Sequence, residues 1–298
     1  SIFRRFSLIR SFCLAYWFSF LNPRKIGPPI LSYRKCNFCG LVFLTPRFSP
    51  PQLKKIYSDP NYFQKLCQST HKLLLDNLLQ IRFFPEYHEY VTSHTPHPGS
   101  LLDIGCGNGE FLQKMHRLSW FVTGIDPSPV AIANAKKILG STVPLKVGNI
   151  RRGTFPPKFD VVTLWHVLEH VPTPLQFLAA AQSYLKPGGK IILEVPNANS
   201  LTLSTFREHY NWLMVPEHIF YYSPQSLIFL LSNLGFKIST LDYPPRAILN
   251  FSFSLYKLFK SKFLFFLSLP VSVLVAILSV LSGKTEVIRV IAQKNDSF

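Results

Sequence analysis

Short apolar runs alternate with helical stretches between residues 99 and 243, and this alternation constrains the fold more than any other feature of the sequence. The apolar runs lie at 100–104, 121–126, 144–150, 159–167, 190–196 and 236–243. The helical stretches between them include 109–118, 129–139, 174–186 and 224–234. Apolar strands that alternate with helices form a parallel sheet that is covered on both faces. We therefore predict a doubly wound α/β domain.

The ends of these segments carry residues that start and stop helices. Ser128 followed by Pro129 is a helix cap with a first-turn proline, and Lys186-Pro187-Gly188-Gly189 is expected to end a helix before the strand at 190–196. Residues 285–294 alternate between apolar and polar side chains, so we expect a final strand there rather than a tail.

A glycine-rich turn connects the first of these strands to its helix. Gly105, Gly107 and Gly109 follow Asp103, which lies near the end of the strand. Glycines in such a turn adopt backbone angles closed to other residues and let a ligand approach the main chain. The spacing is GxGxG and not the GxGxxG of dinucleotide-binding domains. The turn therefore predicts a ligand site, and a tight strand–helix connection without a ligand is the alternative.

This turn resembles motif I of the class I S-adenosylmethionine-dependent methyltransferases. Later segments resemble the same family in the same order: Asp126 at the end of the second strand, Gly148-Asn149-Ile150 after the third, and then residues 159–197 and 216–238. The resemblance covers residues 99–243. It implies a Rossmann-like seven-stranded sheet whose last strand is antiparallel, and S-adenosyl-L-methionine as the cofactor.

The resemblance also implies roles for single residues. The Asp126 carboxylate would accept both ribose hydroxyls of the cofactor, because its two oxygens match the two donors of a vicinal diol. Asn149 stands where the family often has Asp, and its amide would still pair with the adenine. The cofactor-binding residues implied in this way are Asp103, Gly105, Cys106, Gly107, Gly109, Asp126, Asn149, Ile150 and Trp165.

Methyl transfer to a hydroxyl or to an acidic carbon also requires a base. His166 follows the fourth strand and would lie near the methyl group, so it is the first candidate. His218 lies in the region that roofs the substrate in the family, and is the second. Members of the family that methylate nucleic-acid amino groups carry Asn/Asp-Pro-Pro-Tyr/Phe after the fourth strand. This chain lacks that motif, so nucleic acid is not the expected partner.

His166, Glu169 and His170 match the H-x-x-E-H pattern of inverted zinc peptidases. That chemistry needs a long helix, whereas this segment lies at a strand end and is followed by prolines. The chain is also similar to ubiquinone-pathway O-methyltransferases, in which acidic residues and a histidine here can hold a divalent cation. His166 stands where that group has a first Glu, so we predict no metal. Glu169 and His170 then either contact substrate or metal, or fix the turn.

The N-terminal region is basic and apolar. Before residue 61 there are ten Lys and Arg against Asp59 alone, and Phe12–Leu21 is apolar. A basic interfacial segment or a truncated domain start is favoured over a signal peptide, because no small-residue cleavage site follows. Cys36 and Cys39 resemble the second half of a zinc ribbon that precedes many methyltransferases of this type. Without the first CxxC pair, we expect a degenerate half that lacks zinc. Five cysteines in all favour a reducing compartment.

Residues 263–282 form a run of twenty residues without a charge. A single crossing of a bilayer here would place the last strand on the opposite side from its sheet. We therefore expect an interfacial or re-entrant element bent at Pro270, or an apolar helical pair packed on the domain. Nearby Lys257, Lys260 and Lys262 and a formal net charge of +17 favour docking on an anionic membrane surface. A lid over a lipid-like substrate and a true span are the alternatives.

We thus expect an N-terminal region at 1–63, a helical cap at 64–98, a methyltransferase domain at 99–246 and 284–298, and an apolar membrane-associating insertion at 247–283. The predicted function is methyl transfer from S-adenosyl-L-methionine to a small-molecule or lipid-linked acceptor, with oxygen as the first expected atom. The expected location is cytoplasmic, peripheral or monotopic at the inner membrane. An RNA methyltransferase and a catalytically silent cofactor-binding membrane scaffold are the alternative functions.

Overall fold

The computed structural model describes residues 17–19, 32–46, 86–151, 153–155, 159–215, 217–245 and 248–295. Predictions for residues 1–16 and 47–85, which include most of the helical cap, lie outside the described residues. The chain divides into two compact units, and each is described by itself. The large unit comprises Lys54–Val195, Leu230–Pro244 and Ile288–Phe298, and the small unit comprises Ser1–Leu53, Pro196–Phe229 and Pro245–Val287.

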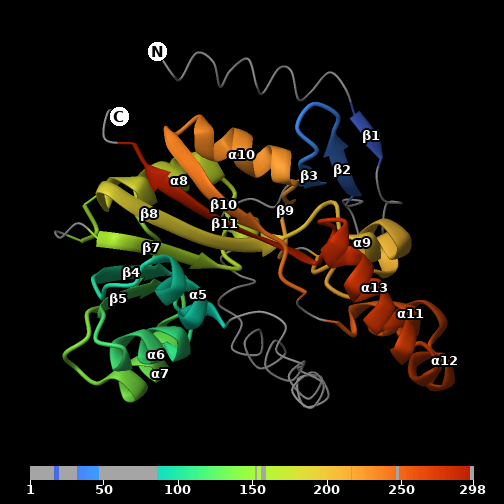
Figure 1. The fold of residues 1–298 in the computed structure, drawn as a ribbon, viewed down its shortest axis with the longest axis horizontal. Coiled ribbons are helices and arrows are strands. Elements are labelled where there is room, and N and C mark those ends of the chain that lie inside the picture. The colour runs from blue at the N-terminus through green and yellow to red at the C-terminus, as the bar shows by residue number, and fades with distance from the viewer. Residues whose placement is uncertain are drawn as a thin grey trace. The chain divides into compact units, whose positions relative to one another are not determined.

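A seven-stranded sheet forms the centre of the large unit, in the order β10-β11-β8-β7-β4-β5-β6 (Figure 1). Its strands are β4 (Ser100–Ile104), β5 (Phe121–Asp126), β6 (Leu145–Val147), β7 (Phe159–Trp165), β8 (Leu185–Pro196), β10 (Phe236–Asp242) and β11 (Val287–Lys294). The neighbouring strands β8, β7, β4, β5 and β6 pair in parallel, whereas β11 is antiparallel to β10. The predicted Rossmann-like sheet with an antiparallel last strand is confirmed.

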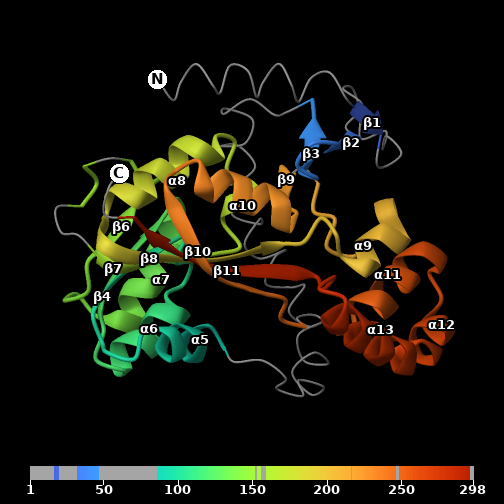
Figure 2. The ribbon, with the colours of Figure 1, turned by 45° about the horizontal axis from the view of Figure 1, so that its top comes forward.

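Helices cover both faces of this sheet, with α6 and α7 on one face and α8 on the other (Figure 2). The helices of this unit are α5 (Tyr87–His94), α6 (Glu110–Arg117), α7 (Pro129–Leu139), the 3-10 turn η1 (Leu168–His170) and α8 (Pro174–Ser183). Helix α10 (Pro224–Ser232) begins in the small unit and ends in the large one. The predicted cap of α7 is present, because Ser128 Oγ accepts the Ala131 N–H at 3.2 Å and Pro129 is the first helical residue.

Apolar side chains between the sheet and its helices make up the core of the large unit. Leu101 on β4, Leu112 on α6, Val161 on β7 and Ile192 on β8 are among its buried members. Each fully buried side chain of this kind contributes about 1.5 to 3 kcal/mol relative to an exposed one. The core thus holds the ends of the parallel strands in fixed positions.

The predicted helix end at Lys186-Pro187-Gly188-Gly189 is wrong. Helix α8 ends at Ser183, and β8 begins at Leu185 and includes these residues. Leu185 pairs with Phe159, and the next pair is Lys190 with Val161, so the residues between them form an irregularity in the strand. Gly188, with φ of +69°, supplies the left-handed conformation that this irregularity requires.

The small unit contains a four-stranded sheet in the order β1-β2-β3-β9. Its strands are β1 (Trp17–Ser19), β2 (Ser32–Cys36), β3 (Val42–Thr45) and β9 (Phe220–Tyr221). Tyr33, Leu44, Leu203 and Tyr221 are among the residues of its core. The sequence did not predict this sheet, because β9 is very short and pairs with a strand far away along the chain.

The two cysteines of the CxxC segment lie around the hairpin turn between β2 and β3. Cys36 ends β2 and is buried, and Gly40 donates its N–H to the Cys36 carbonyl at 2.8 Å. Within the described ranges, no group of three possible metal ligands includes either cysteine. The degenerate zinc-ribbon half without zinc stays a prediction.

The predicted helical insertion before the last strand is present. In the small unit, α9 (Leu201–Phe206) and the 3-10 turn η2 (Arg207–His209) are followed by α11 (Asn250–Phe259), α12 (Lys262–Leu267) and α13 (Leu269–Leu281). Residues 263–282 thus form two helices that meet at Ser268, and Pro270 lies in the first turn of α13. Among the described helices, none combines the length and the apolar character needed to cross a membrane.

Candidate active site

The glycine turn adopts the geometry of a ligand-binding loop. Gly105, Gly107 and Gly109 have φ of +80°, +51° and +82°, which places all three in the left-handed region. A Cβ on Gly105 would lie 2.4 Å from a Val167 methyl carbon, so this glycine is required by close packing. A Cβ on Gly107 would meet no atom within 4 Å. The main chain is therefore open to a ligand at Gly107.

Asp126 closes this loop from the end of β5. Its Oδ2 accepts the Gly107 N–H at 3.0 Å, and its Oδ1 accepts the Ser128 N–H at 2.8 Å. Burial raises its pKa, although these two hydrogen bonds favour the charged form. Each carboxylate oxygen has a second lone pair, so the group can still accept two hydroxyls of a ligand.

Asp103 lies below the loop, at the end of β4, and is 2% exposed. Thr163 Oγ1 donates to its Oδ1 at 2.7 Å. Burial, together with the nearby charge of Asp126, raises the pKa of Asp103 to about 7. Asp103 is thus tied through Thr163 to the neighbouring strand β7.

The loop residue Cys106 and the segment after β6 complete the surroundings of Asp126. Burial, with the charges of Asp103 and Asp126, raises the pKa of the Cys106 thiol far above its ordinary range, so this side chain is neutral. Gly148 donates its N–H to the Asp126 carbonyl at 2.9 Å. This bond brings the following residues, exposed Asn149 and buried Ile150, to the same edge of the sheet as Asp126.

The predicted cofactor residues therefore fit a nucleoside-containing cofactor. The main chain is open at Gly107, and Asp126 retains acceptor capacity beside it. Trp165, at the end of β7, has a buried Nε1–H with no acceptor among the described residues. A buried N–H of this kind normally has a partner, which a ligand in this position would supply.

His166 follows Trp165 and lies between two buried carboxylates. Its Nδ1 is 3.3 Å from Glu169 Oε1, and its Nε2 is 3.1 Å from Glu194 Oε1. Its backbone is in the left-handed region, with φ of +56°, and its N–H donates to the Glu194 carbonyl at 3.0 Å. A non-glycine residue in this conformation is strained and persists only where surrounding contacts hold it. Such residues are concentrated at functional sites.

The two carboxylates control the protonation of His166. Burial lowers the pKa of the imidazole, but the hydrogen bonds and negative charges of Glu169 and Glu194 outweigh this effect and raise the pKa to about 9. The side chain is 34% exposed, so the ring remains accessible. The site therefore stabilises the imidazolium, which is the form that a base adopts after it has removed a proton.

A buried ion pair supports this histidine, and sequence reasoning missed both of its members. Arg289 on β11 places Nη2 at 2.6 Å and Nε at 2.8 Å from Glu194 Oε2, and Tyr87 donates to Glu194 Oε1 at 3.0 Å. One signal was present in the sequence: Glu194 and Arg289 each interrupt an apolar strand. Because charged side chains are rarely buried unless they are paired, each of them indicates a buried partner of opposite charge. Nothing in the local sequence identified the partners.

Aromatic side chains form a wall beside these charges. Tyr87 stacks on Trp165 with ring centroids 4.2 Å apart, and Phe111 meets Trp165 edge-on at 5.5 Å. The Arg289 guanidinium lies 4.3 Å from the Tyr90 ring centroid. Such a wall excludes water from one side of the site, which strengthens the electrostatic interactions within it.

The predicted site residues are divided between the two units of the chain. Glu169 and His170 lie in η1 of the large unit, where Glu169 contacts His166. His218 belongs to the small unit, where it is buried and its Nδ1 lies 3.1 Å from the Tyr221 hydroxyl. The catalytic role of His218 and the absence of a metal at Glu169 and His170 stay predictions.

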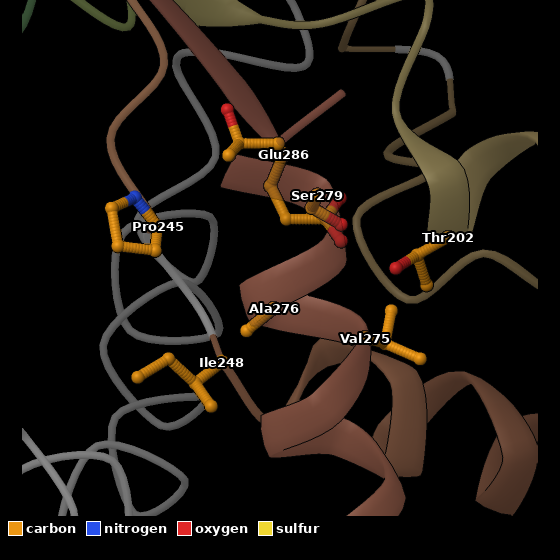
Figure 3. Close-up of a pocket in the computed structure, with 8 residues that line it drawn as sticks. Thr202, Pro245, Ile248, Val275, Ala276, Ser279 and Glu286 are labelled. Atoms are coloured by element: carbon orange, nitrogen blue, oxygen red, sulfur yellow. The ribbon is translucent and has the colours of Figure 1, made fainter. Parts of the chain in front are cut away.

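A pocket in the small unit is lined by Thr202, Pro245, Ile248, Val275, Ala276, Ser279, Thr285 and Glu286 (Figure 3). Its volume of about 10 Å³ is close to the room that one water molecule requires. The Glu286 carboxyl at its wall accepts hydrogen bonds from Tyr210 at 2.6 Å and from Ser200 at 2.8 Å, and burial raises its pKa. The pocket is too small for a methyl acceptor.

A family model described as a methyltransferase domain matches residues 66–241. Similar curated proteins are named "Ubiquinone biosynthesis O-methyltransferase". The Burkholderia thailandensis protein is 30% identical over 64% of this chain and 90% of its own length, and the Xanthomonas euvesicatoria protein is 33% identical over 53% and 72%. The mitochondrial protein of Schizosaccharomyces pombe is 39% identical, over 37% of this chain and only 43% of its own length.

Solved structures share the fold at low sequence identity. The 1,6-didemethyltoxoflavin-N1-methyltransferase of Burkholderia thailandensis, solved with S-adenosylhomocysteine bound, aligns with a TM-score of 0.53 at 15% identity, over 92% of this chain and 99% of its own. A plantazolicin methyltransferase aligns with a TM-score of 0.53 at 18% identity, over 82% and 94%.

Proposed function

Because the chain belongs to the class I S-adenosylmethionine-dependent methyltransferases, we propose that it transfers the methyl group of S-adenosylmethionine to a hydroxyl oxygen of a small-molecule acceptor. The observation that carries the choice of oxygen is the position of His166 between Glu169 and Glu194. A hydroxyl is a poor nucleophile until its proton is removed, and this arrangement stabilises the proton on the histidine. The names of the curated relatives point the same way.

The cofactor is held by the residues around the glycine turn. Gly107 would let the cofactor approach the main chain, Gly105 and Gly109 hold the turn by packing closely on Val167 and Ala135, and Cys106 would contribute its backbone. Asp126 would accept the ribose hydroxyls, and Asn149 and Ile150 would contact the adenine. Asp103 supports the turn, and Trp165 contributes its Nε1–H. When bound, S-adenosylmethionine supplies an electrophilic methyl group on a sulfonium centre.

His166 acts as the base. It would take the proton of the acceptor hydroxyl and hold it as an imidazolium stabilised by Glu169 and Glu194. The cofactor, when bound, would give up its methyl group to the oxygen by loss of the sulfur–methyl bond and leave as the neutral thioether S-adenosylhomocysteine. The raised pKa of about 9 makes the neutral ring a strong base, suited to an acidic hydroxyl such as a phenol. His218 is the second candidate base.

We also propose that the acceptor is lipid-linked and that the enzyme meets it at an anionic membrane surface, in a peripheral or monotopic position. The net charge of +17 supports the attraction to anionic headgroups. The helices α11–α13 support it as well, because they carry many exposed apolar side chains.

Calorimetry with S-adenosylhomocysteine tests the cofactor part of this proposal. We expect micromolar binding by the full chain and loss of binding in Asp126→Ala. Asp160→Ala is the control, because Asp160 is a half-exposed carboxylate that pairs with Lys186 and accepts the Ser100 N–H at the opposite end of the strands from Asp126. Absence of binding to a well-folded wild-type protein would contradict the proposal.

Transfer of a labelled methyl group tests the acceptor. A lipid-linked phenol and the corresponding aniline are compared, each in detergent. We expect methylation of the phenol and little of the aniline. Equal or preferred methylation of the amine would contradict the choice of oxygen.

A further inference from the structure

Helices α11 and α13 reverse the usual distribution of polar and apolar residues, whereas the short α12 between them buries Phe265. The buried residues of α11 are Asn250, Ser252 and Ser254, and those of α13 are Ser272 and Ser279. The large apolar side chains point outward instead: Phe263 is 74% exposed and Leu281 is 79% exposed. A helix in water normally buries its apolar stripe and exposes its polar face.

Hydrogen bonds between serines hold the three helices together on the inside. Ser252 Oγ lies 2.5 Å from Ser272 Oγ, and Ser268 Oγ donates to Ser252 Oγ at 2.8 Å. Figures 1 and 2 both show these helices side by side. Helices in a bilayer associate through small polar residues of this kind, because lipid gives apolar side chains no reason to turn inward.

The lengths of the helices restrict how they can meet a bilayer. Helix α13 has 13 residues, which at 1.5 Å per residue give about 20 Å. The hydrocarbon core of a bilayer is about 30 Å thick. Backbone that enters it must satisfy its hydrogen bonds internally, as these helices do. The arrangement suits insertion into one leaflet.

The charges around the helices match anionic lipid headgroups. Lys260 after α11, Lys262 at the start of α12 and Lys284 after α13 are all exposed. No Asp or Glu occurs in the sequence from Tyr243 to Thr285. A second copy of the chain on this face would bring like charges together, which disfavours self-association.

We propose that α11–α13 form a monotopic element that inserts its apolar face among the acyl chains of one leaflet and places its lysines at anionic headgroups. The inference builds on the membrane association proposed above, and it identifies the surface responsible. Neither cofactor nor acceptor is needed for this insertion, so it can be tested apart from catalysis.

Flotation of the full chain with vesicles of equal parts phosphatidylcholine and phosphatidylglycerol tests the inference. The variant Leu274→Gln/Ile277→Gln/Leu278→Gln is expected to lower vesicle partitioning at least about tenfold, because it removes apolar area from the inserted face. Phe121→Gln/Val130→Gln/Val147→Gln is the matched control, since it removes three apolar side chains that are similarly exposed on other elements. We expect this control to float like the wild type.

Two further measurements keep the result interpretable. Hydrogen–deuterium exchange in residues 262–281 is expected to slow when vesicles are added. S-adenosylhomocysteine binding shows that each variant is folded, and it separates failure of membrane insertion from failure of the proposed methyltransferase function. The inference is overturned if the wild type does not float, if the α13 variant floats equally well, or if that variant instead dissociates a dimer formed without lipid.

Discussion

Arg289 and Glu194 are 95 residues apart in the sequence, and they form an ion pair with no exposed side-chain surface, at 2.6 Å between Nη2 and Oε2. Glu194 also contacts His166 through its other oxygen. The pair thus connects the last strand of the sheet with the candidate base. Four charged groups meet here, and the positive charges of Arg289 and protonated His166 balance the two carboxylates of Glu169 and Glu194.

Removal of one partner of this pair is expected to destabilise the protein strongly. Arg289→Met leaves the Glu194 carboxylate buried without its main counter-charge, so we expect a loss of about 3 to 5 kcal/mol in the free energy of unfolding. The double variant Glu194→Gln/Arg289→Met should recover much of the loss, because no charge of the pair remains. Urea denaturation of the four proteins in this cycle measures the coupling. Additive losses would show that the pair does not act as a unit.

Replacement of His166 is expected to affect the reaction and not cofactor binding. His166→Gln keeps a polar side chain at the site but removes the base, so kcat should fall about 100- to 10,000-fold. S-adenosylhomocysteine affinity should stay within about twofold of the wild type, because the cofactor is held by the glycine turn and Asp126. The same kinetics on His218→Gln show whether the second candidate contributes. An unchanged kcat in His166→Gln would assign the role elsewhere.

The rate of methyl transfer should rise with pH up to about 9. Only the neutral imidazole can accept a proton, and with a pKa of about 9 it makes up about 1% of the enzyme at pH 7. Below that pKa, kcat/KM should therefore increase about tenfold per pH unit. In Glu169→Gln one of the two carboxylates is gone, so the profile should move to lower pH. If the dependence of kcat/KM on pH is the same in Glu169→Gln as in the wild type, it reflects ionisation of the acceptor and not of His166, and the prediction is wrong.

Stability should also depend on the protonation of His166. Its pKa in the folded protein is raised from 6.5 to about 9, so the folded state binds the proton more tightly than the unfolded state. This stabilisation is fully present below about pH 6.5 and is lost as the pH rises through about 9. The difference in free energy of unfolding between wild type and His166→Gln should therefore shrink over this range. A difference that grows with pH would contradict the assigned direction.

Gly107→Ala should weaken cofactor binding more than it weakens the fold. An alanine at φ of +51° costs about 1 to 2 kcal/mol of strain, but its Cβ would stand in open space where the cofactor approaches the main chain. Gly153→Ala is the matched control, because Gly153 also has a positive φ, of +83°, and open space around it, but lies in an exposed turn outside the glycine turn. We expect similar melting temperatures for both variants, and at least about tenfold weaker S-adenosylhomocysteine binding for Gly107→Ala alone. Equal affinities would show that the cofactor does not approach Gly107.

Much of the large unit could be predicted because its signals are local. Most strands of the sheet contain a short apolar run, and the site around Gly107 and Asp126 lies in the turns that directly follow two neighbouring strands. The extent of β8 could not be predicted, because the residues from Lys186 to Gly189 are typical of the end of a helix. In the structure β7 pairs with Leu185 before these residues and with Lys190 after them, so the strand continues through them. The four-stranded sheet could not be predicted either, since β3 and β9 meet from distant parts of the chain.

The sequence by itself determined the doubly wound fold, the family resemblance, the glycine turn with its acidic partner, and the presence of an apolar insertion before the last strand. Only the tertiary structure decided which charges meet at His166. Glu194 and Arg289 lie on two strands that are neighbours in the sheet, and the sequence of neither strand indicates which strand it lies beside. It also decided that the serines of α11 and α13 turn inward and the apolar side chains outward. Composition records how many side chains of each kind a helix has, but packing against its neighbours sets the direction in which each one points.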